Sequence, residues 1–394
     1  MNIFFNFNYL FTLKSHDVLY ELNMKKISVL SIFNKLDTTI IPLENFINLD
    51  DQIDKYILVL DQNKNLAQKE ISKLYPNKKM YLITFEGLGI WRIIQLLKNK
   101  ISVVHTHHTK SALLGLILKI IFRTYLIHTV HNNFLVGYNK IQKIVFRLIF
   151  LFADRLIANS LETFKSLPSF INKNKKVVIH NSIDDIKLAK YSNDLEKINI
   201  KKRKLVFGTV CRLVDFKNIP LIVKSFEKII FIHKIDASLI IIGAGPLETK
   251  LKNLVKMLNL SDRVEFTGLL NRDNVYERVR GFDAFVVSSL YEGFCNAMVE
   301  AAAIGVPLIV SNIHTLREVL GGFQNASFFE SNNLDALTNL MRFFSSTENY
   351  EMINKKAINA KKYVLKNYSK KKISELYKNQ YFELYFRNAK FKNE

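Results

Sequence analysis

The chain has 394 residues, of which 48% are hydrophobic and 23% are charged. This length and composition predict two globular domains and exclude intrinsic disorder, collagen-like repeats and a small disulfide-bonded scaffold. Lys and Arg (57) exceed Asp and Glu (35), which gives a net charge of +22 and indicates either anionic partners or a biased genome.

The N-terminal segment is apolar and precedes a second methionine, Met24. It lacks a positively charged beginning and a small-residue cleavage site, so it does not have the pattern of a secretory signal. We expect residues 1–23 to be an extension, either a misassigned start or a loosely attached arm. No uncharged apolar run approaches the roughly 20 residues that span a bilayer. The two cysteines, Cys211 and Cys295, provide no disulfide framework, which favours the cytosol.

Short β-branched runs alternate with longer helical patterns, which predicts parallel strands joined by helical crossovers. In the first half of the chain the expected strands are residues 27–32, 56–60, 79–83, 103–105, 125–129, 155–158 and 177–179. A polar, charge-rich stretch without strand character follows. In the second half the expected strands are 205–210, 238–242, 263–266, 284–288, 307–310 and 327–329, and the expected helices are 221–232, 248–258, 274–280, 299–304 and 334–344.

These elements predict two doubly wound, Rossmann-like α/β domains whose sheets present their carboxyl ends to one central cleft. The C-terminal stretch is expected to be helical because five apolar residues recur at helical spacing: Ile373, Leu376, Tyr377, Tyr381 and Leu384. The expected division is an extension at 1–23, a first domain at 24–185, a linker at 186–203, a second domain at 204–368 and a terminal helix at 369–394.

The most informative motif is YEGFCNAMVEAAAIGVPLIVS, residues 291–311, which follows an expected strand. We expect Glu292 at the mouth of a helix and Glu300 further along the same helix. Gly293 allows close approach of the backbone to a ligand, and free amides at a helix N-terminus attract phosphate or sugar oxygens. A carboxylate there suits sugar hydroxyls or a developing positive charge. The alternative is an ordinary helix-terminal charge together with a solvated Glu300.

Two cations follow the first strand of the expected second domain, in GTVCRLVDFKNIPLIVKSF at residues 208–226. Arg212 and Lys217 would point into the same cleft and suit a pyrophosphate leaving group, unless they are solvated surface charges. Gly243 and Gly245 in LIIIGAGPLETKL permit close backbone approach, although such glycines are also ordinary turn residues. The sequence contains neither the dinucleotide fingerprint GxGxxG nor a P-loop.

Five histidines follow strands of the expected first domain, in HTHHTKS (105–111) and HTVHN (128–132). Imidazoles suit zinc, but no carboxylate or thiolate companion is near them in the sequence, so we expect polar groups of the cleft rather than a metal site. The chain also has no Asp-x-Asp pair to hold a nucleotide-bound cation. We therefore expect no metal and no other cofactor.

No Asp or Glu occurs in residues 87–153, which contain nine Lys and Arg residues. Within this stretch NKIQKIVFRLIFLF alternates cations with large apolar residues at helical spacing, as a helix on an anionic bilayer does. A core-facing helix with a basic, solvated back gives a similar pattern. Nucleic acid is not an expected partner, because helix-turn-helix, RRM and zinc-finger patterns are absent from the sequence.

Taken in order, GTVCRLVDFK, IIIGAGPLETKL, VEFTGLL, FVVSSLYEGFCNAMVEAAAIGVPLIVS and LREVLGG resemble the nucleotide-sugar half of glycosyltransferase family 4, retaining enzymes of the GT-B fold. HTHHTKSALLG, HTVHN, DRLIANS and VVIHNSID resemble the N-terminal landmarks of the same family. The resemblance implies a nucleotide-sugar donor held by the second domain, an acceptor held by the first, and transfer with retention and without a metal. It also implies a last helix that crosses back onto the first domain.

Site residues follow from the resemblance by motif position. Arg212 and Lys217 would bind the diphosphate, Glu300 the ribose hydroxyls, and Glu292 would lie beside the donor sugar. The glycine-free loop SIFNKLDTT after the first strand departs from the family pattern. The expected site consists of Glu292 and His131 for catalysis, of Arg212, Lys217, Gly243, Gly245, Gly293, Phe294, Cys295 and Glu300 for the donor, and of His107 and His108 for the acceptor.

The expected function is transfer of a sugar from a nucleotide sugar to a glycan or polyprenyl-diphosphate-linked acceptor in bacterial surface-polysaccharide assembly. The protein would work in the cytoplasm, peripherally attached to the anionic inner face of the plasma membrane. The alternatives are a GT-B-fold nucleotide-sugar epimerase and a non-catalytic, basic membrane-binding protein. Because residues 87–153 lack acids, we expect a front-face mechanism in which the leaving phosphate helps to deprotonate the acceptor hydroxyl.

Overall fold

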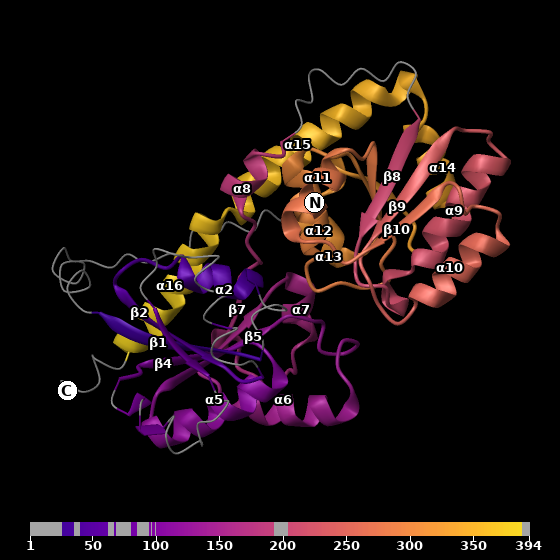
Figure 1. The fold of residues 1–394 in the computed structure, drawn as a ribbon. Helices are drawn as coiled ribbons and strands as arrows, with labels where there is room; N and C mark the ends of the chain where they lie inside the picture. Colours follow the sequence, from indigo (N-terminus) through magenta and orange to yellow (C-terminus); the bar gives the residue numbers. More distant parts are fainter. Residues whose placement is uncertain are drawn as a thin grey trace, which may run out of the picture.

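The chain forms two α/β halves that lie side by side, with the C-terminal helices running across both (Figure 1). The computed structural model describes residues 26–34, 40–61, 67, 80–84, 94–95, 97–98, 100–192 and 204–387. The expected extension at 1–23 and residues 193–203 of the expected linker lie outside the described residues. Shortly before residues 193–203 the chain forms a short helix, α8 (Asp185–Ala189), which buries Leu188.

The first half contains a seven-stranded parallel sheet in the order β3-β2-β1-β4-β5-β6-β7. Strand order reverses between β1 and β4, and open α/β sheets bind ligands beside such a switch point. The register pairs Ser31 with His105, which brings the histidine-rich segment to this point. The strands are β1 (Ile27–Phe33), β2 (Ile53–Val59), β3 (Tyr81–Thr84), β4 (Val103–Thr106), β5 (Tyr125–Val130), β6 (Arg155–Ala158) and β7 (Lys176–Val178).

The second half contains a six-stranded parallel sheet in the order β10-β9-β8-β11-β12-β13. Its switch point lies between β8 and β11, and the loops that carry Arg212 and Glu292 follow these two strands. Every strand expected from the sequence is present, although several ends are shifted. The strands are β8 (Leu205–Val210), β9 (Ala237–Ile242), β10 (Val264–Gly268), β11 (Ala284–Val287), β12 (Leu308–Ser311) and β13 (Ser327–Phe329).

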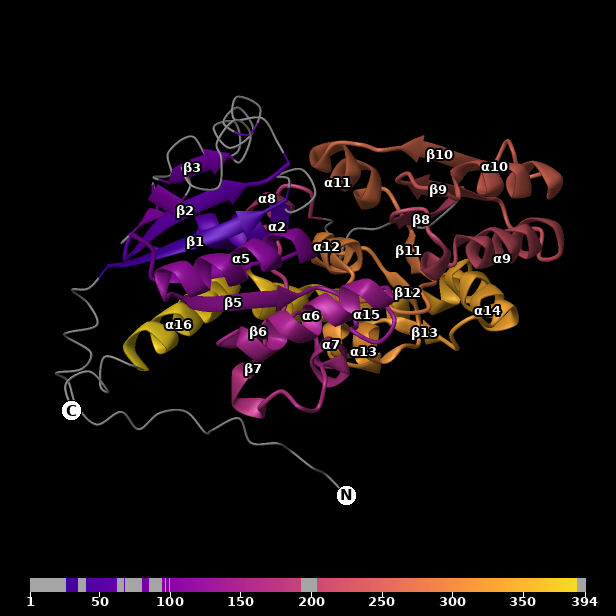
Figure 2. The ribbon, with the colours of Figure 1, turned by 90° about the horizontal axis from the view of Figure 1, so that it is seen from below.

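Helices cover both faces of each sheet, which explains why the strands are near-continuous apolar runs. In β1, Ile27 and Val29 pack with α2 and α16, whereas Leu30 and Ile32 pack with α5 and α6. Figure 2 shows the two sheets side by side, with α12 near the middle of the molecule. The longer helices are α2 (Ile40–Ile47), α5 (Thr109–Phe122), α6 (Lys140–Phe152), α7 (Leu161–Ser166), α9 (Ile219–Phe231), α10 (Glu248–Met257), α11 (Arg272–Arg280), α12 (Asn296–Ile304), α13 (His314–Leu320), α14 (Leu334–Phe344), α15 (Tyr350–Tyr368) and α16 (Lys370–Arg387).

The last helix, α16, packs against the first sheet, which confirms the expected crossing of the C-terminus. Its Tyr381 is 1% exposed, and its Glu383 accepts a hydrogen bond of 2.6 Å from Arg155 of β6. The C-terminal stretch is helical as expected, but of the five apolar residues at helical spacing Leu376 is 39% exposed. The residues that join the first-domain core are Ile373, Tyr377, Tyr381 and Leu384.

Candidate active site

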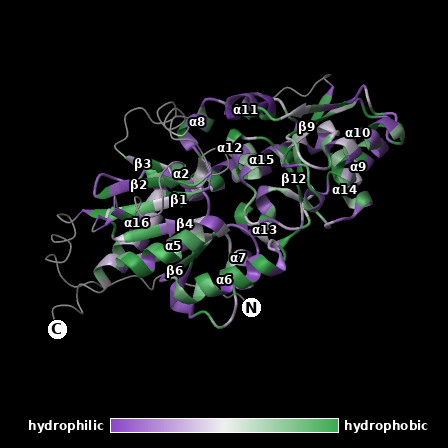
Figure 3. Cartoon of the chain, turned by 60° about the horizontal axis from the view of Figure 1, so that its bottom comes forward, coloured by the Kyte–Doolittle hydropathy of each residue, from purple (hydrophilic) through white to green (hydrophobic). Residues whose placement is uncertain are grey.

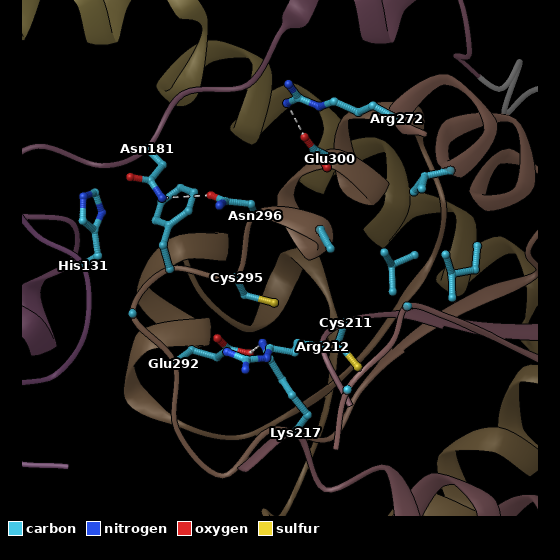
Figure 4. Close-up of a pocket in the computed structure, with 18 of the residues that line it drawn as sticks. His131, Asn181, Cys211, Arg212, Lys217, Arg272, Glu292, Cys295, Asn296 and Glu300 are labelled. Carbon is cyan, nitrogen blue, oxygen red and sulfur yellow. Dashed lines mark hydrogen bonds and ion pairs between the residues drawn. The ribbon is translucent and has the colours of Figure 1, made fainter. Parts of the chain in front are cut away.

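A cavity of about 950 Å³ lies between the two domains. Its second-domain wall comes from α11, α12 and the loops after β8, β9, β10 and β11, and its first-domain wall from α2 and the loops after β4, β5, β6 and β7. Residues of both walls, among them His131, Lys217 and Glu292, are drawn in Figure 4. The expected residues that line it are His108, His131, Arg212, Lys217, Gly243, Gly245, Glu292, Gly293, Phe294, Cys295 and Glu300. His107 is the one expected residue that does not.

Glu292 and Lys217 form an ion pair in the wall of the cavity. Glu292 is 7% exposed and also accepts a hydrogen bond of 2.7 Å from the Ser289 hydroxyl. Burial by itself lowers the pKa of Lys217, but the Glu292 carboxylate, together with Cys295 and Cys211, raises it above its usual value. Lys217 is therefore a fixed positive charge directly beside Glu292.

Glu292 lies in a loop and not on the helix where we expected it, because α12 begins only at Asn296. The residue before the helix, Cys295, has a left-handed backbone with φ of 69°. This sharp turn leaves the loop amides at the helix N-terminus beside the cavity. The Phe294 side chain packs into the second-domain core, so only the backbone of Phe294 is suited to a ligand contact.

At Gly293 the backbones of the two domains lie in close contact. A Cβ atom on Gly293 would lie only 2.0 Å from the carbonyl oxygen of His131, which no side chain could tolerate without movement. The same carbonyl accepts a hydrogen bond of 2.8 Å from the Asn159 side chain. The absence of a side chain at Gly293 therefore lets Glu292 and His131 lie across from each other in one site.

Glu300 is bound by two residues of α11 that the sequence analysis did not identify. Arg272 Nη2 donates to Glu300 Oε1 at 2.6 Å, and the Tyr276 hydroxyl donates to the same oxygen at 2.9 Å. Arg272 and Tyr276 are four residues apart and therefore share a face of the helix. The spacing of these two residues in RDNVYERVR indicates a shared helix face. It does not distinguish a binding face from an ordinary one, because a charged helix face is usually exposed to solvent.

Arg212 is exposed at the end of β8 and lines the cavity with Lys217. Gly243 and Gly245 line it too, but their close contacts are with protein backbone. A Cβ at Gly243 would lie 2.0 Å from the Cys211 carbonyl oxygen, and one at Gly245 would lie 2.4 Å from that of Leu213. These glycines pack the loop after β9 against the loop after β8, and so they position Arg212.

His131, which is partly buried at the cavity, and the buried His107 form an imidazole pair on the first-domain side. His107 is 4% exposed, stacks on Phe33 with ring centroids 5.0 Å apart, and has its Nδ1 3.4 Å from His131 Nε2. Burial lowers the pKa of both imidazoles well below the usual range. His131 is therefore a neutral hydrogen-bonding group at neutral pH, and His107 lies behind it rather than on the acceptor surface.

Within the part of the chain that the structure describes, no three His, Cys, Asp or Glu side chains lie close enough together to hold a metal ion. Five charged side chains of the described residues line the cavity. Lys217, Arg212 and Arg272 supply the cations, and Glu292 and Glu300 supply the carboxylates.

Both cysteines are free and line the cavity, Cys295 as expected for the donor site. Burial raises the pKa of Cys211 to about 11 and also raises that of Cys295, so both remain weakly reactive thiols at neutral pH. We expect a bound nucleoside diphosphate to slow alkylation of both thiols further by covering them. The measurement is the rate of iodoacetamide labelling by mass spectrometry. Equal rates with and without nucleotide would mean that the thiols only fill space in the wall.

Comparison with solved structures identifies the fold. Anabaena HepE, solved in complex with UDP and glucose, aligns over 90% of this chain and 99% of its own length with a TM-score of 0.75 and 15% identity. The fold is thus GT-B, with two Rossmann-like domains around a central cleft, as the sequence predicted.

Sequence comparisons identify the family. Residues 53–186 match the model of Glycosyltransferase Family 4, and residues 190–363 match that of Glycosyl transferases group 1. An uncharacterized glycosyltransferase of Methanocaldococcus jannaschii is 30% identical over 314 residues, which cover 74% of this chain and 73% of the relative. UDP-Gal:alpha-D-GlcNAc-diphosphoundecaprenol alpha-1,3-galactosyltransferase of Escherichia coli is 30% identical over 269 residues, 64% of this chain and 68% of the relative. The chain belongs to glycosyltransferase family 4 and is a glycosyltransferase.

Proposed function

We propose that the protein is a retaining glycosyltransferase that moves a sugar from a nucleoside diphosphate sugar to a hydroxyl of a polyprenyl-diphosphate-linked glycan in bacterial surface-polysaccharide assembly. The name of the Escherichia coli relative, which gives a UDP-sugar donor and a diphosphoundecaprenol-linked acceptor, supports this substrate class. The observation that carries the proposal is the Lys217–Glu292 pair, which faces His131 of the other domain across one cavity.

The charged and polar side chains of the cavity indicate which part of the substrates each would contact. Arg212 and Lys217 suit the diphosphate, whose negative charge grows as the glycosidic bond breaks, because cations aimed at the place where charge develops stabilise it. Glu292 suits the positive charge that develops on the sugar. His131 is neutral and would accept or donate a hydrogen bond to a sugar hydroxyl without adding charge.

A front-face reaction is the mechanism that these residues support. Among the described residues that line the cavity, the carboxylates are Glu292 and Glu300, and both belong to the second domain. A second carboxylate on the acceptor side, which could act as a nucleophile, is therefore lacking in that wall. The leaving phosphate would instead take the proton of the acceptor hydroxyl as the new bond forms on the face that the phosphate leaves.

The donor is tested by a thermal-shift screen with UDP, GDP, ADP and CMP sugars, because a ligand that binds the folded state raises its apparent stability. We expect one base to stabilise the protein clearly, and transfer of a labelled sugar from that donor to a lipid-linked acceptor. Stabilisation by none of these donors, or release of an isomerised sugar that is still linked to nucleotide, would contradict the proposed transfer.

We expect the reaction to need no divalent metal. The sequence has no Asp-x-Asp pair, and Arg212 and Lys217 are suited to neutralise the diphosphate directly. The measurement is the rate of transfer after dialysis against EDTA, which should equal the untreated rate. Loss of activity that Mg²⁺ or Mn²⁺ restores would contradict this expectation.

The outer surface of α5 and α6 supports attachment to a membrane. The inward face of α6 buries Phe146, Ile149 and Phe150, while Ile141 and Ile144 on its outer face are 74% and 61% exposed. In Figure 3 both helices carry broad hydrophobic areas on the outside of the first domain. A core-facing helix with a solvated, purely basic back would not have these exposed apolar residues. The exposed apolar side chains of the two helices are Leu113, Ile117, Ile120, Ile121, Ile141, Ile144, Leu148, Leu151 and Phe152.

Exposed cations lie on or at the ends of the same two helices, among them Arg123, Lys140 and Arg147. An apolar face with a basic rim lies in the interface of an anionic bilayer, and each cation near the surface contributes about 1 kcal/mol. None of the helices that the structure describes is long and apolar enough to cross a membrane. Peripheral attachment at the inner leaflet would bring the cavity close to a lipid-linked acceptor.

We expect the protein to bind vesicles that contain phosphatidylglycerol more tightly than neutral vesicles, and this binding to weaken at high salt. Ile144→Glu should reduce binding, because it places a negative charge in the apolar surface. The matched control is Met257→Glu on α10, which replaces a residue that is 72% exposed on the second domain. Vesicle co-sedimentation measures both. Equal binding to neutral vesicles, binding to neither kind, or equal effects of the two variants would contradict attachment through α5 and α6.

A further inference from the structure

Arg272 of α11 lies between carboxylates of the two domains. Its Nη2 donates to Oε1 of Glu300 at 2.6 Å, and its Nη1 donates to Oε1 of Glu44 in α2 at 2.8 Å. All three side chains are mostly buried: Arg272 is 21% exposed, Glu300 13% and Glu44 8%. Arg272 and Glu300 line the cavity, as Figure 4 shows, whereas Glu44 is not among the residues that line it. A planar guanidinium can hold two acids in fixed directions.

The alternation of charges continues beyond Glu44. Lys370 Nζ lies 3.9 Å from Glu44 Oε2 and donates to Asp184 Oδ2 at 2.8 Å. Burial by itself raises the pKa of Asp184, but Lys370, the Lys187 amide and Arg272 together lower it, so Asp184 stays ionised at neutral pH. We call Glu300, Arg272, Glu44, Lys370 and Asp184 the charge ladder.

The far end of the charge ladder lies where the chain passes between the domains. Ile183 pairs with Ser369 in a parallel bridge, and its amide donates to the Tyr368 carbonyl at 2.8 Å. Asp184 and Lys370 are the next residues on the two paired segments. The charge ladder thus runs from the cavity to the place where the two crossings of the chain lie side by side.

Helix α2 is anchored at the same place, which fixes the position of Glu44. Its Asn45 accepts a hydrogen bond from the Ser182 hydroxyl through its side chain and one of 3.2 Å from the Ser374 hydroxyl through its carbonyl. Ser182 precedes the first crossing and Ser374 belongs to α16. Glu44 therefore keeps its place relative to the first domain, and its distance from Arg272 depends on how the domains sit relative to each other.

We propose that Arg272 is a positioning residue that holds Glu300 in its donor-binding orientation only while Glu44 of the first domain shares its guanidinium, in an arrangement of the two domains that we call closed. Donor affinity then depends on Glu44, a residue of the acceptor domain that does not line the cavity. The proposal rests on the proposed function, in which Glu300 binds the ribose of the donor. Coupling is reciprocal, so a donor that fixes Glu300 and Arg272 also favours the closed arrangement of the domains.

The test measures UDP affinity by calorimetry and donor kinetics at saturating acceptor for Glu44→Gln, Arg272→Lys and Glu300→Gln. We expect Glu44→Gln and Arg272→Lys each to weaken UDP binding and raise donor KM by about tenfold. Their kcat should remain close to that of the unaltered protein, because saturating donor restores closure. The amide of Gln is isosteric with the carboxylate, and a melting curve for each variant establishes that it is folded.

A double-mutant cycle separates positioning from simple support of the fold. If Glu44 acts through Arg272 on Glu300, then Glu44→Gln as a single substitution should weaken UDP binding. Added to Glu300→Gln, it should weaken UDP binding little further. A purely structural role would give equal costs in both backgrounds. The matched control is Glu265→Gln, which removes the ion pair of Glu265 with Arg278 on the same helix and should not change UDP binding.

The outcomes distinguish the inference from the proposed function. If Glu300→Gln weakens UDP binding but Glu44→Gln does not, or if the two effects are additive, the positioning role of Arg272 is wrong and the donor site stands. If Glu300→Gln leaves UDP affinity unchanged, the ribose assignment of the proposed function is wrong, and the inference falls with it.

Discussion

Replacing Glu292 with Gln is expected to lower kcat by about one to two orders of magnitude without raising donor KM. Glu292 lies in the loop after β11, in the wall of the cavity, beside the proposed position of the donor sugar. Positive charge develops there as the glycosidic bond loosens. A carboxylate stabilises that charge more in the transition state than in the ground state, so its loss is measured in kcat.

The ion pair with Lys217 determines what we expect for donor binding. Because Glu292 holds the Lys217 ammonium, the neutral Gln side chain leaves this cation freer to contact the diphosphate. Affinity for the donor should therefore stay the same or rise slightly. A variant that merely disturbed the site would instead bind the donor more weakly.

Steady-state kinetics with saturating acceptor measure this expectation, and Glu300→Gln is the matched comparison. The ribose contacts proposed for Glu300 are nearly equal in the ground and transition states, so Glu300→Gln should mainly raise donor KM. If Glu292→Gln keeps its kcat, or if both variants change only KM, then Glu292 is not at the reacting centre. Melting temperatures of both variants establish that they are folded.

The sheets could be predicted from the sequence because their strands are buried on both faces. Near-continuous apolar runs such as ASLIII in β9 stand out between polar helices, and β-branched residues favour extended backbone. In a doubly wound parallel sheet the loops after the strands gather at its carboxyl edge, which places the loops after β8 and β11 beside the cleft. The motif residues at those strand ends accordingly lie in one cavity.

The contacts between domains could not be predicted, because each depends on residues far apart in the chain. Glu44 and Arg272 are 228 positions apart and belong to helices with no recognisable motif. Leu376 has the spacing of a buried residue but is exposed. The spacing of apolar residues indicates which face of a helix is turned to the core, but it does not indicate how wide the buried part of that face is. His107 resembles a cleft residue in sequence. It directly follows β4, a strand in the middle of the sheet, and the His107 side chain turns toward Phe33.

Gly293 is the position where we expect the smallest chemical change to have the largest effect. Gly293→Ala should reduce kcat/KM by about 100-fold or more, since a displacement of about 1 Å in an active site costs that much. The added methyl group would lie 2.0 Å from the His131 carbonyl oxygen and 3.0 Å from the Asn159 amide nitrogen. The His131 carbonyl belongs to the backbone, and it is held by Asn159, so it cannot turn aside as a flexible side chain could.

The methyl group therefore has to push the Glu292 loop and the His131 loop apart. Each domain keeps its own core, because Gly293 is at the contact between them, so the melting temperature should change much less than the activity. Gly281→Ala is the control: its Cβ would lie 3.4 Å from the Arg278 carbonyl oxygen, an ordinary contact, and it should leave kcat/KM unchanged. If Gly293→Ala retained full activity, the close approach of the two loops would be unnecessary for transfer, and Glu292 and His131 would not need to act in one site.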